Sequence, residues 1–264
     1  MPVRTRVAAV QMPFGNLVPE NLAAMETVVG RLARRRVRFA VFPECCLSGY
    51  LVPAPERDWP AILAGVERMR ELARERRMAI VFGTALPNEK ARKLPFNSVL
   101  ALDERGRVVS RYDKCHLMPG DRECFSPGRK LPEVFRLAGL KVAMQICFDV
   151  RFPEPARAAA LSGAEVLTYS FAGFGSGGWK LPVMEGHLRS RAAENGVFAI
   201  GANCAHRVMI VTSRIVDPDG LDLAAAPVRR AVEIVADIDP AAAHRKFLRD
   251  RRPDLYPLSS QSRR

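Results

Sequence analysis

The sequence has 264 residues, of which 48% are hydrophobic and 26% are charged. These values are ordinary for a globular protein and exclude an intrinsically disordered chain, because enough apolar residues are present for a sizeable core. The formal net charge is +13, but the arginines lie in separate short runs with few aromatic residues between them. A solvated basic surface is therefore expected, and nucleic acid is not expected as a partner.

The N-terminal segment indicates the compartment of the protein, and the spacing of the cysteines indicates whether they bind a metal. Residues 1–12 lack the apolar segment and the cleavage site of a secretory signal, and no apolar run approaches the roughly 20 residues of a membrane span. We therefore expect a cytoplasmic protein that binds no membrane. The six cysteines include no Cys-x-x-Cys pair. They are expected to be reduced thiols, and neither a metal nor another cofactor is expected.

In chain order, short apolar segments alternate with amphipathic ones, which is typical of an α/β protein whose helices cover the faces of a sheet. Helices are expected at residues 19–35, 61–77, 153–163 and 182–194. Strands are expected at residues 7–11, 39–42, 78–82, 98–102, 108–112, 140–146, 166–169, 198–202, 208–216 and 232–237. A turn-like Asp-Glu-Arg-Gly segment joins the fourth and fifth strands, so part of the sheet is expected to be antiparallel. No long linker interrupts the chain, so residues 1–264 are expected to form one domain with a polar tail from about residue 258.

Three chemically reactive residues follow predicted strands almost directly: Glu44, Lys114 and Cys147. The carboxyl ends of strands form the ligand-binding edge of open α/β sheets. We therefore expect these three side chains to converge on one cleft, although they are far apart in the sequence.

The segments around these residues resemble the three motifs of the nitrilase superfamily of carbon–nitrogen hydrolases, in its amidase-like branch. They read VFPECCLSGY around Glu44, RYDKCHLMPG around Lys114 and VAMQICFDVRFPEPAR around Cys147, in the order and approximate spacing of the family. The later segments RSRAAENGVFAIGAN and IVDPDG also resemble family segments, so the resemblance covers nearly the whole chain. It implies a four-layer αββα sandwich.

The resemblance also implies a cysteine-dependent hydrolase of non-peptide carbon–nitrogen bonds, which converts a small linear amide to a carboxylate and ammonia. Glu44 would take the thiol proton, and Cys147 would attack as a thiolate to form a thioester. Lys114, with a backbone N–H near Phe148, would stabilise the oxyanion. The remaining cysteines have no matching motif and are expected to be structural, like most buried cysteines: Cys45, Cys46, Cys115, Cys124 and Cys204.

One position departs from the family pattern. Family members usually carry a second glutamate between the lysine and a downstream Pro-Gly pair. Alignment on Phe125, Pro127 and Gly128 places Asp121 at this position, with Glu123 two residues later. Either Asp121 acts with a shorter side chain or a shifted loop brings in Glu123, so both are candidate substrate-binding residues.

Several neighbouring residues are expected to support the site. His116 is expected to pack behind the lysine loop rather than to act as the base of a Cys-His pair, because a base must reach the proton that it takes. Asp149, Arg151 and Glu154 are expected to brace the turn that carries Cys147 through hydrogen bonds.

The glycine-rich segment at residues 173–180 is not a phosphate-binding P-loop, because no Gly-Lys-Ser or Gly-Lys-Thr follows it. It is either a mobile wall of the substrate pocket, with Phe174 and Trp179 closing over the substrate, or a plain flexible loop. In the first interpretation Trp179 is a candidate substrate-binding residue, and Phe148, next to Cys147, is a further candidate.

The sequence leaves several alternatives open. The same thiolate attack serves a nitrile or an N-carbamoyl substrate, and acyl transfer to an acceptor other than water would use the same intermediate. Basic residues near the pocket would favour an amide that carries a carboxylate, but the sequence does not show which arginines face the cleft. A non-catalytic polyanion-binding scaffold is a remote alternative. Because the family commonly assembles through faces of its sandwich, a homodimer or larger homo-oligomer is expected.

Overall fold

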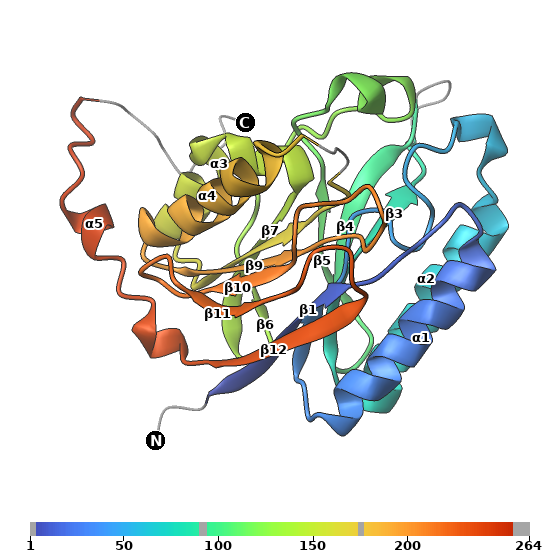
Figure 1. Ribbon diagram of the computed structural model, residues 1–264, viewed down its shortest axis with the longest axis horizontal. Helices are drawn as coiled ribbons and strands as arrows, with labels where there is room; N and C mark the ends of the chain where they lie inside the picture. The colour runs from blue at the N-terminus through green and yellow to red at the C-terminus, as the bar shows by residue number, and fades with distance from the viewer. Residues whose placement is uncertain (1–3, 90–93, 174–176, 256–264) are drawn as a thin grey trace.

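The computed structural model describes residues 4–89, 94–173 and 177–255. Its strands form two six-stranded sheets that pack face to face, with a pair of helices against the outer face of each sheet (Figure 1). This arrangement is the four-layer αββα sandwich that the resemblance to the nitrilase superfamily implies.

Most predicted elements are present, with ends that differ by a few residues. The strands are β1 (Thr5–Gln11), β2 (Phe39–Val41), β3 (Ala79–Leu86), β4 (Phe96–Leu102), β5 (Val108–Asp113), β6 (Phe135–Leu137), β7 (Leu140–Ile146), β8 (Val166–Ser170), β9 (Phe198–Ala202), β10 (Arg214–Val216), β11 (Asp222–Ala225) and β12 (Val232–Ile238). The helices are α1 (Val18–Arg34), α2 (Trp59–Arg76), α3 (Pro153–Leu161), α4 (Lys180–Ala193) and α5 (Lys246–Arg249). Short 3-10 helices lie at η1 (Ala54–Glu56), η2 (Pro119–Glu123), η3 (Cys147–Arg151) and η4 (Pro240–Ala242).

Each sheet has three adjacent parallel strands flanked by antiparallel ones. The first has the order β12-β1-β2-β3-β4-β5, in which β1, β2 and β3 are parallel and β4 and β5 continue as an antiparallel meander. The second has the order β11-β10-β9-β8-β7-β6, in which β7, β8 and β9 are parallel. Strand β4 runs antiparallel to β3, and β5 runs antiparallel to β4. Strand β5 therefore runs in the same direction as β2 and ends at the same edge of the sheet.

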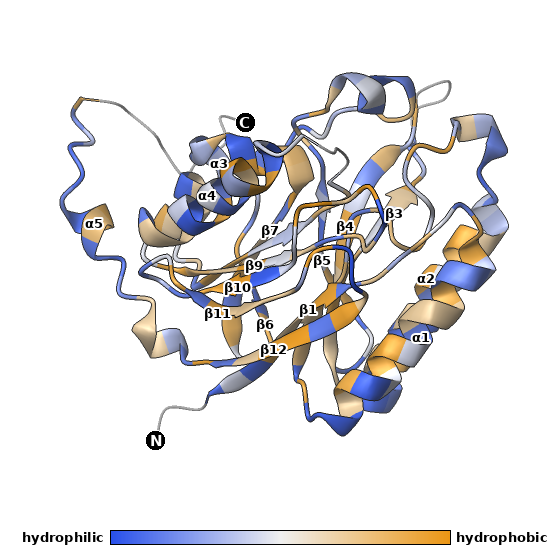
Figure 2. Cartoon of the chain, in the orientation of Figure 1, coloured by the Kyte–Doolittle hydropathy of each residue, from blue (hydrophilic) through white to orange (hydrophobic). Residues whose placement is uncertain are grey.

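Three apolar layers hold the sandwich together: one between α1, α2 and the first sheet, one between the sheets, and one beneath α3 and α4. Strand β1 contributes to two of them. Val7 and Ala9 pack in the layer between the sheets, whereas Ala8 and Val10 pack in the helix layer. Burial on both faces explains why the central strands are almost continuously apolar. Helices α1 and α2 instead mix hydrophobic and hydrophilic residues (Figure 2), because only one side of each is buried.

The strand predicted at residues 208–216 is wrong over most of its length, because only Arg214–Val216 forms β10. Side chains from other segments form hydrogen bonds with the backbone of the residues just before β10. Asn203 Nδ2 donates to the carbonyl oxygen of Val211 at 2.7 Å, and the N–H of Ser213 donates to Gln11 Oε1 at 2.7 Å. These bonds replace the ladder that a longer strand would need.

Strands β6 and β11 are absent from the sequence prediction. Both are short and lie at the edges of the second sheet. A strand at an edge can form without a marked pattern of apolar residues, so the sequence gives little sign of it. Ala138 and Gly139, both with positive φ, join β6 to β7 in a tight turn.

Arginines that are separated in the sequence meet beside the C-terminal ends of α1 and α2. They line an open pocket of about 550 Å³ together with Glu104: Arg36, Arg38, Arg76, Arg77 and Arg105. All five are exposed, and within the described ranges none of their side chains forms an ion pair. Part of the basic surface is therefore concentrated rather than scattered. No helix in the described residues is long and apolar enough to span a membrane.

Candidate active site

The loops that carry the three motif residues meet at one edge of the sandwich. Glu44 follows β2, Lys114 follows β5 and Cys147 follows β7. The N–H of Lys114 donates to the carbonyl oxygen of Asn97 at 2.8 Å, which fixes the lysine loop to β4. The N–H of Glu44 donates to the carbonyl oxygen of Phe171 at 3.2 Å, which joins the two sheets at this edge.

The Glu44 carboxylate is fully buried and accepts three hydrogen bonds. Its Oε1 accepts from Lys114 Nζ at 2.7 Å and from Asn97 Nδ2 at 2.7 Å. Its Oε2 accepts from the N–H of Ala172 at 2.9 Å. These donors come from both sheets, so the position of the carboxylate depends on the packing of the whole sandwich.

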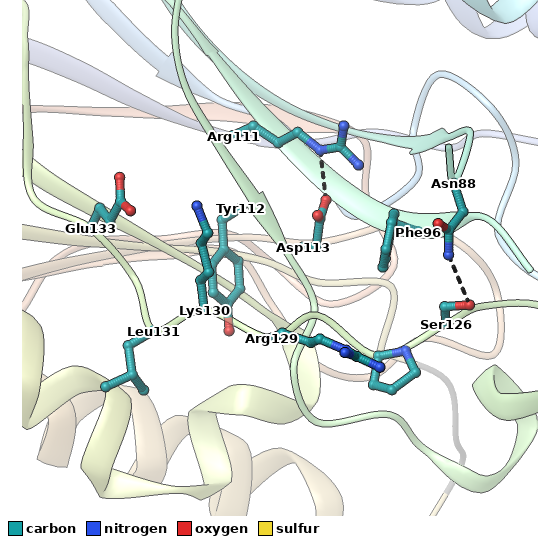
Figure 3. Close-up of a pocket in the computed structure, with 11 residues that line it drawn as sticks. Asn88, Phe96, Arg111, Tyr112, Asp113, Ser126, Arg129, Lys130, Leu131 and Glu133 are labelled. Carbon is teal, nitrogen blue, oxygen red and sulfur yellow. Dashed lines mark hydrogen bonds and ion pairs between the residues drawn. The ribbon is translucent and has the colours of Figure 1, made fainter. Parts of the chain in front are cut away.

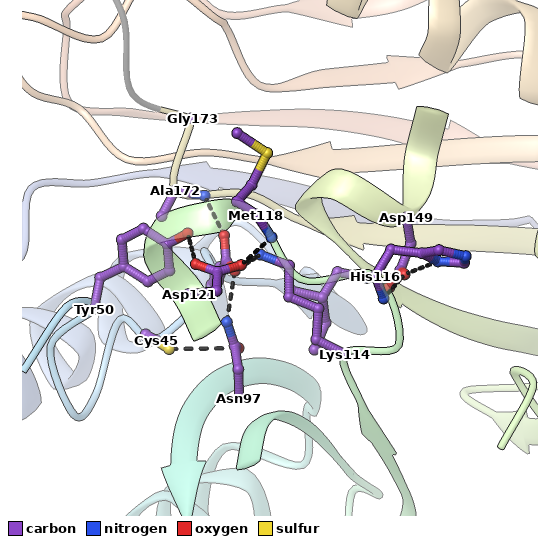
Figure 4. A network of polar contacts seen from close by, with 12 residues as sticks. Cys45, Tyr50, Asn97, Lys114, His116, Met118, Asp121, Asp149, Ala172 and Gly173 are labelled. Carbon is purple, nitrogen blue, oxygen red and sulfur yellow. Dashed lines mark hydrogen bonds and ion pairs between the residues drawn. The ribbon is translucent and has the colours of Figure 1, made fainter. Parts of the chain in front are cut away.

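Lys114 lies between two carboxylates. Its Nζ is 2.7 Å from Glu44 Oε1 and 2.7 Å from Asp121 Oδ2, and all three side chains are buried. Asp121 also accepts from the Tyr50 hydroxyl at 2.5 Å and from the N–H of Met118 at 3.0 Å. Figure 4 shows the lysine side chain pointing into this group. The ammonium is therefore held in one position by charged partners.

The structure brings Asp121, and not Glu123, to the lysine. Asp121 is 0% exposed, whereas Glu123 is exposed at the end of η2. The shorter aspartate side chain reaches Lys114 because η2 carries its backbone close to the lysine loop. No shift of the loop is needed.

Cys147 occupies a strained turn between β7 and η3. Its φ is +44°, in the left-handed region that residues with a Cβ seldom adopt. Asp149, two residues later, accepts from the N–H of Ile146 at 3.1 Å and closes the turn. The side chain of Cys147 is half-buried and lines a pocket.

Burial and charge set the protonation of the three groups. Burial, followed by the charge of Glu44, raises the pKa of the Cys147 thiol to about 12, while Lys114 and a hydrogen bond from the Ala172 backbone oppose the rise. Burial also raises the pKa of Glu44 against the attraction of Lys114. Burial acts to lower the pKa of Lys114, but Glu44 and the other nearby anions outweigh it and raise the pKa. The resting cysteine is therefore a thiol that needs a base, beside a permanently charged ammonium.

Asp149 connects the lysine loop to the cysteine turn. It is buried and accepts from the Tyr112 hydroxyl at 2.9 Å and from the N–H of His116 at 3.0 Å, and it lies 2.7 Å from His116 Nδ1. The His116 ring stacks on Phe152, with ring centroids 3.9 Å apart. Glu154 is exposed and its side chain makes no hydrogen bond within the described ranges, so the structure does not show it bracing the turn.

A pocket of about 450 Å³ opens above Cys147. It is lined by Tyr50, Leu51, Met118, Gly120, Asp121, Cys147, Phe148, Arg151, Ala172, Gly173, Lys180 and Met184. Phe148 thus faces the pocket. Trp179 is 62% exposed and lies beside the lining rather than in it. Phe174 lies outside the described residues.

Sequence reasoning did not identify Asn97, Tyr50 or Ala172 as parts of the site. Tyr50 lies within the first motif segment, so its position was a usable signal. Asn97 lies on an antiparallel strand far from any motif, and Ala172 acts through its backbone N–H, which no side-chain pattern reveals.

A second pocket, of about 280 Å³, lies along β5 and contains none of the three motif residues (Figure 3). Its Arg111 is paired with Asp113 at 2.8 Å. Within the described part of the chain, no group of His, Cys, Asp and Glu is arranged to hold a metal ion.

The fold and the match to the carbon–nitrogen hydrolase family together define a cysteine-dependent carbon–nitrogen hydrolase. The profile of the carbon–nitrogen hydrolase family matches residues 6–245, and the chain belongs to this family.

Relatives and solved structures agree with this assignment. An (R)-stereoselective amidase from a Pseudomonas species is 34% identical over 80% of this chain and 78% of its own length. An N-carbamoylputrescine amidase from Solanum lycopersicum is 30% identical over 96% of this chain and 93% of its own. A cysteine-to-alanine mutant of a nitrilase-superfamily amidase from Nesterenkonia has a TM-score of 0.86 at 27% identity, covering 97% of both chains.

A second Nesterenkonia structure bears on the chemistry. It is a glutamate-to-glutamine mutant of the amidase that shows covalent addition of the acetamide moiety of fluoroacetamide at the active-site cysteine. It has a TM-score of 0.82 at 27% identity and covers 96% of this chain and 95% of that one.

Proposed function

We propose that this chain is an amidase that hydrolyses small linear amides through a thioester on Cys147. The observation that carries the proposal is the buried contact of Glu44 with Lys114, at 2.7 Å, beside the pocket that Cys147 lines. A buried carboxylate and a buried ammonium are costly to maintain. Their placement next to a strained cysteine is explained by the chemistry that the three groups perform together.

In the first half of the reaction, Glu44 takes the proton of the Cys147 thiol, and the sulfur attacks the amide carbon. The carbonyl oxygen becomes an oxyanion, which Lys114 and a backbone N–H near Phe148 stabilise. The tetrahedral intermediate then collapses, the carbon–nitrogen bond breaks, and Glu44 returns its proton to the leaving nitrogen. Ammonia departs and the acyl group stays on the sulfur as a thioester.

In the second half, Glu44 takes a proton from water, and the resulting hydroxide attacks the thioester carbon. A second oxyanion forms at the same position and collapses, and the carbon–sulfur bond breaks. The thiolate receives the proton from Glu44, which regenerates the starting enzyme and releases the carboxylic acid. The same base therefore serves both halves.

Asp121 positions the ammonium in this proposal. It accepts a hydrogen bond from Lys114 Nζ, as Glu44 also does, and is itself held by the Tyr50 hydroxyl and the N–H of Met118. The lysine thus keeps both its charge and its orientation when a proton moves onto Glu44. Asp121 here replaces the glutamate that the family pattern usually carries.

The test is ammonia release from a panel of small amides, nitriles and N-carbamoyl compounds. We expect amides to be turned over by the wild type and not by Cys147→Ala. Cys115→Ala is a matched control, because Cys115 and Cys147 are both half-buried free thiols, and it should retain activity. Hydroxylamine should trap the acyl group as a hydroxamate in the wild type and in this control, but not in Cys147→Ala.

Circular dichroism of each variant separates lost chemistry from lost folding. A folded Cys147→Ala protein that still releases ammonia would exclude Cys147 as the nucleophile. A reduced, folded wild type that is inert on every amide but active on a nitrile or a carbamoyl compound would replace the proposed substrate class.

A further inference from the structure

Two basic side chains line the same pocket as Cys147. Arg151 is the last residue of η3, the turn that begins with Cys147, and Lys180 is the first residue of α4. Both are half-buried. Two like charges at the wall of a partly closed pocket repel each other, and an anion bound between them relieves that repulsion.

The described residues supply no acidic partner for either cation. Asp121 is the carboxylate in the lining, and its two oxygens are already engaged by Lys114 and by Tyr50. The guanidinium of Arg151 lies over the rings of Phe148 and Trp179, at 5.9 and 6.0 Å from their centroids. Such cation–π contacts orient the guanidinium plane and leave its N–H groups able to bind an anion.

The electrostatics of Lys180 connect these groups to the nucleophile. Burial lowers the pKa of Lys180, a thiolate at Cys147 raises it, and the charge of Arg151 lowers it further. Lys180 is therefore within electrostatic range of both Arg151 and Cys147. All three residues line one pocket of about 450 Å³.

We propose that Arg151 and Lys180 form a carboxylate-binding subsite and that the preferred substrate is a short ω-amide of a dicarboxylic acid. This inference rests on the proposed amidase function. The amide carbon lies at Cys147, the distal carboxylate binds the two cations, and the methylene chain contacts apolar lining such as Met118 and Met184. Charge-assisted hydrogen bonds to a guanidinium are stronger than neutral ones and are directional. The same two cations repel an amide that carries an ammonium group.

Three amides of similar size and different charge test this subsite. Succinamate carries the carboxylate, 4-methylpentanamide replaces it with an isopropyl group of the same shape, and 4-aminobutanamide carries a positive charge. At an ionic strength of about 0.15 M, which screens long-range attraction, we expect kcat/KM for succinamate to exceed that for the neutral amide by at least about tenfold. The cationic amide should be the poorest of the three.

Substitutions of Lys180 assign this preference to the pocket. Lys180→Met keeps the length of the side chain but removes its charge, and it should lower the ratio of anionic to neutral kcat/KM by about tenfold, mainly through KM. Lys180→Glu should move the preference toward the cationic amide. Lys130→Met is the control, because it removes the same charge from an exposed position outside this pocket, and it should leave the ratio unchanged.

The possible failures are distinct. An active wild type with equal kcat/KM for the anionic and neutral amides would overturn the subsite and leave the amidase function standing. A wild type inert on all amides would overturn both. Lys180→Met lowering all three rates equally would mean a structural role for Lys180. A drop in the ratio in Lys130→Met would mean that the net positive charge, and not a subsite, attracts the anion.

Discussion

At the scale of single residues, the site consists of one cation between two carboxylates, next to a thiol whose pKa is high. Glu44 must therefore be ionised for the cysteine to react, although burial favours its protonated form. Lys114 provides the opposing charge at 2.7 Å. The pKa of Glu44, and with it the pH dependence of the activity, should follow the balance between burial and the charge of Lys114.

We expect the acid limb of the kcat/KM profile to lie above the ordinary glutamate pKa of 4.5. As pH falls through the raised pKa of Glu44, the base becomes protonated and activity is lost; as pH rises, activity returns. Because the pKa of Lys114 is also raised, the ammonium should not deprotonate below about pH 10. Kinetics from about pH 4 to 10 test this, and a limb below 4.5 would contradict it.

Glu44→Gln should lower kcat by at least about a hundredfold, because a general base contributes about 10²–10⁴ to the rate. The amide can still accept from Lys114, so the variant should fold. If the folded variant retained wild-type kcat, another group would have to be the base.

Asp121 and Glu123 can be distinguished by a matched pair of variants. Asp121→Asn removes the charge 2.7 Å from Lys114 Nζ and should lower kcat/KM by about tenfold or more. Glu123→Gln changes an exposed side chain and should have little effect. Steady-state kinetics on one amide compare them, and a larger loss in Glu123→Gln would reverse the assignment.

At the scale of elements, the turn that carries Glu44 packs directly on the backbone of β3. A Cβ added at Gly83 would lie 2.3 Å from the Cys45 nitrogen, 2.6 Å from the Pro43 oxygen and 2.7 Å from Glu44 Cα. Only a residue without a side chain permits this approach. The position of the base therefore depends on a glycine in the neighbouring strand.

Gly83→Ala should consequently destabilise the protein by about 1–3 kcal/mol, since overpacking displaces backbone, and should lower kcat as well. Gly186→Ala is the matched control. Gly186 lies inside α4, and a Cβ added there would meet nothing within 4 Å, so this variant should stabilise the helix by about 0.5–1 kcal/mol. Urea unfolding measures both. Equal stability of the two variants would contradict the close approach at Gly83.

At the scale of the whole molecule, the formal charge of +13 is concentrated in part at the five arginines beside α1 and α2. These exposed guanidinium groups repel one another in the folded state more than in the unfolded chain. Screening that repulsion should favour folding.

Raising NaCl from about 0.02 M to about 0.3 M should therefore raise Tm by about 1–3 °C. Arg77→Gln should reproduce part of the increase at low salt and reduce the response to added salt. Differential scanning fluorimetry measures both, and a Tm that falls with salt would show that the ion pairs elsewhere on the surface outweigh the arginine repulsion.

A homo-oligomer also stays a prediction, which light scattering would test.

From the sequence by itself, apolar periodicity predicted an α/β protein, and the resemblance of three spaced motifs to the nitrilase superfamily implied the family and the four-layer fold, because these are local signals that survive without coordinates. The sequence also predicted that Glu44, Lys114 and Cys147 follow strands, whereas their catalytic roles stay predictions. The edge strands β6 and β11 and the short β10 escaped it, since pairing with a neighbour and bonds to distant side chains decide those segments.

Only the tertiary structure decided which groups meet. Asn97 and the N–H of Ala172 reach Glu44 from different sheets, and Asp121 rather than Glu123 reaches Lys114. Arg151 and Lys180 come to share the pocket with Cys147. Each outcome depends on the register of long-range strand pairing and on the direction of individual side chains, and neither is encoded in a local pattern.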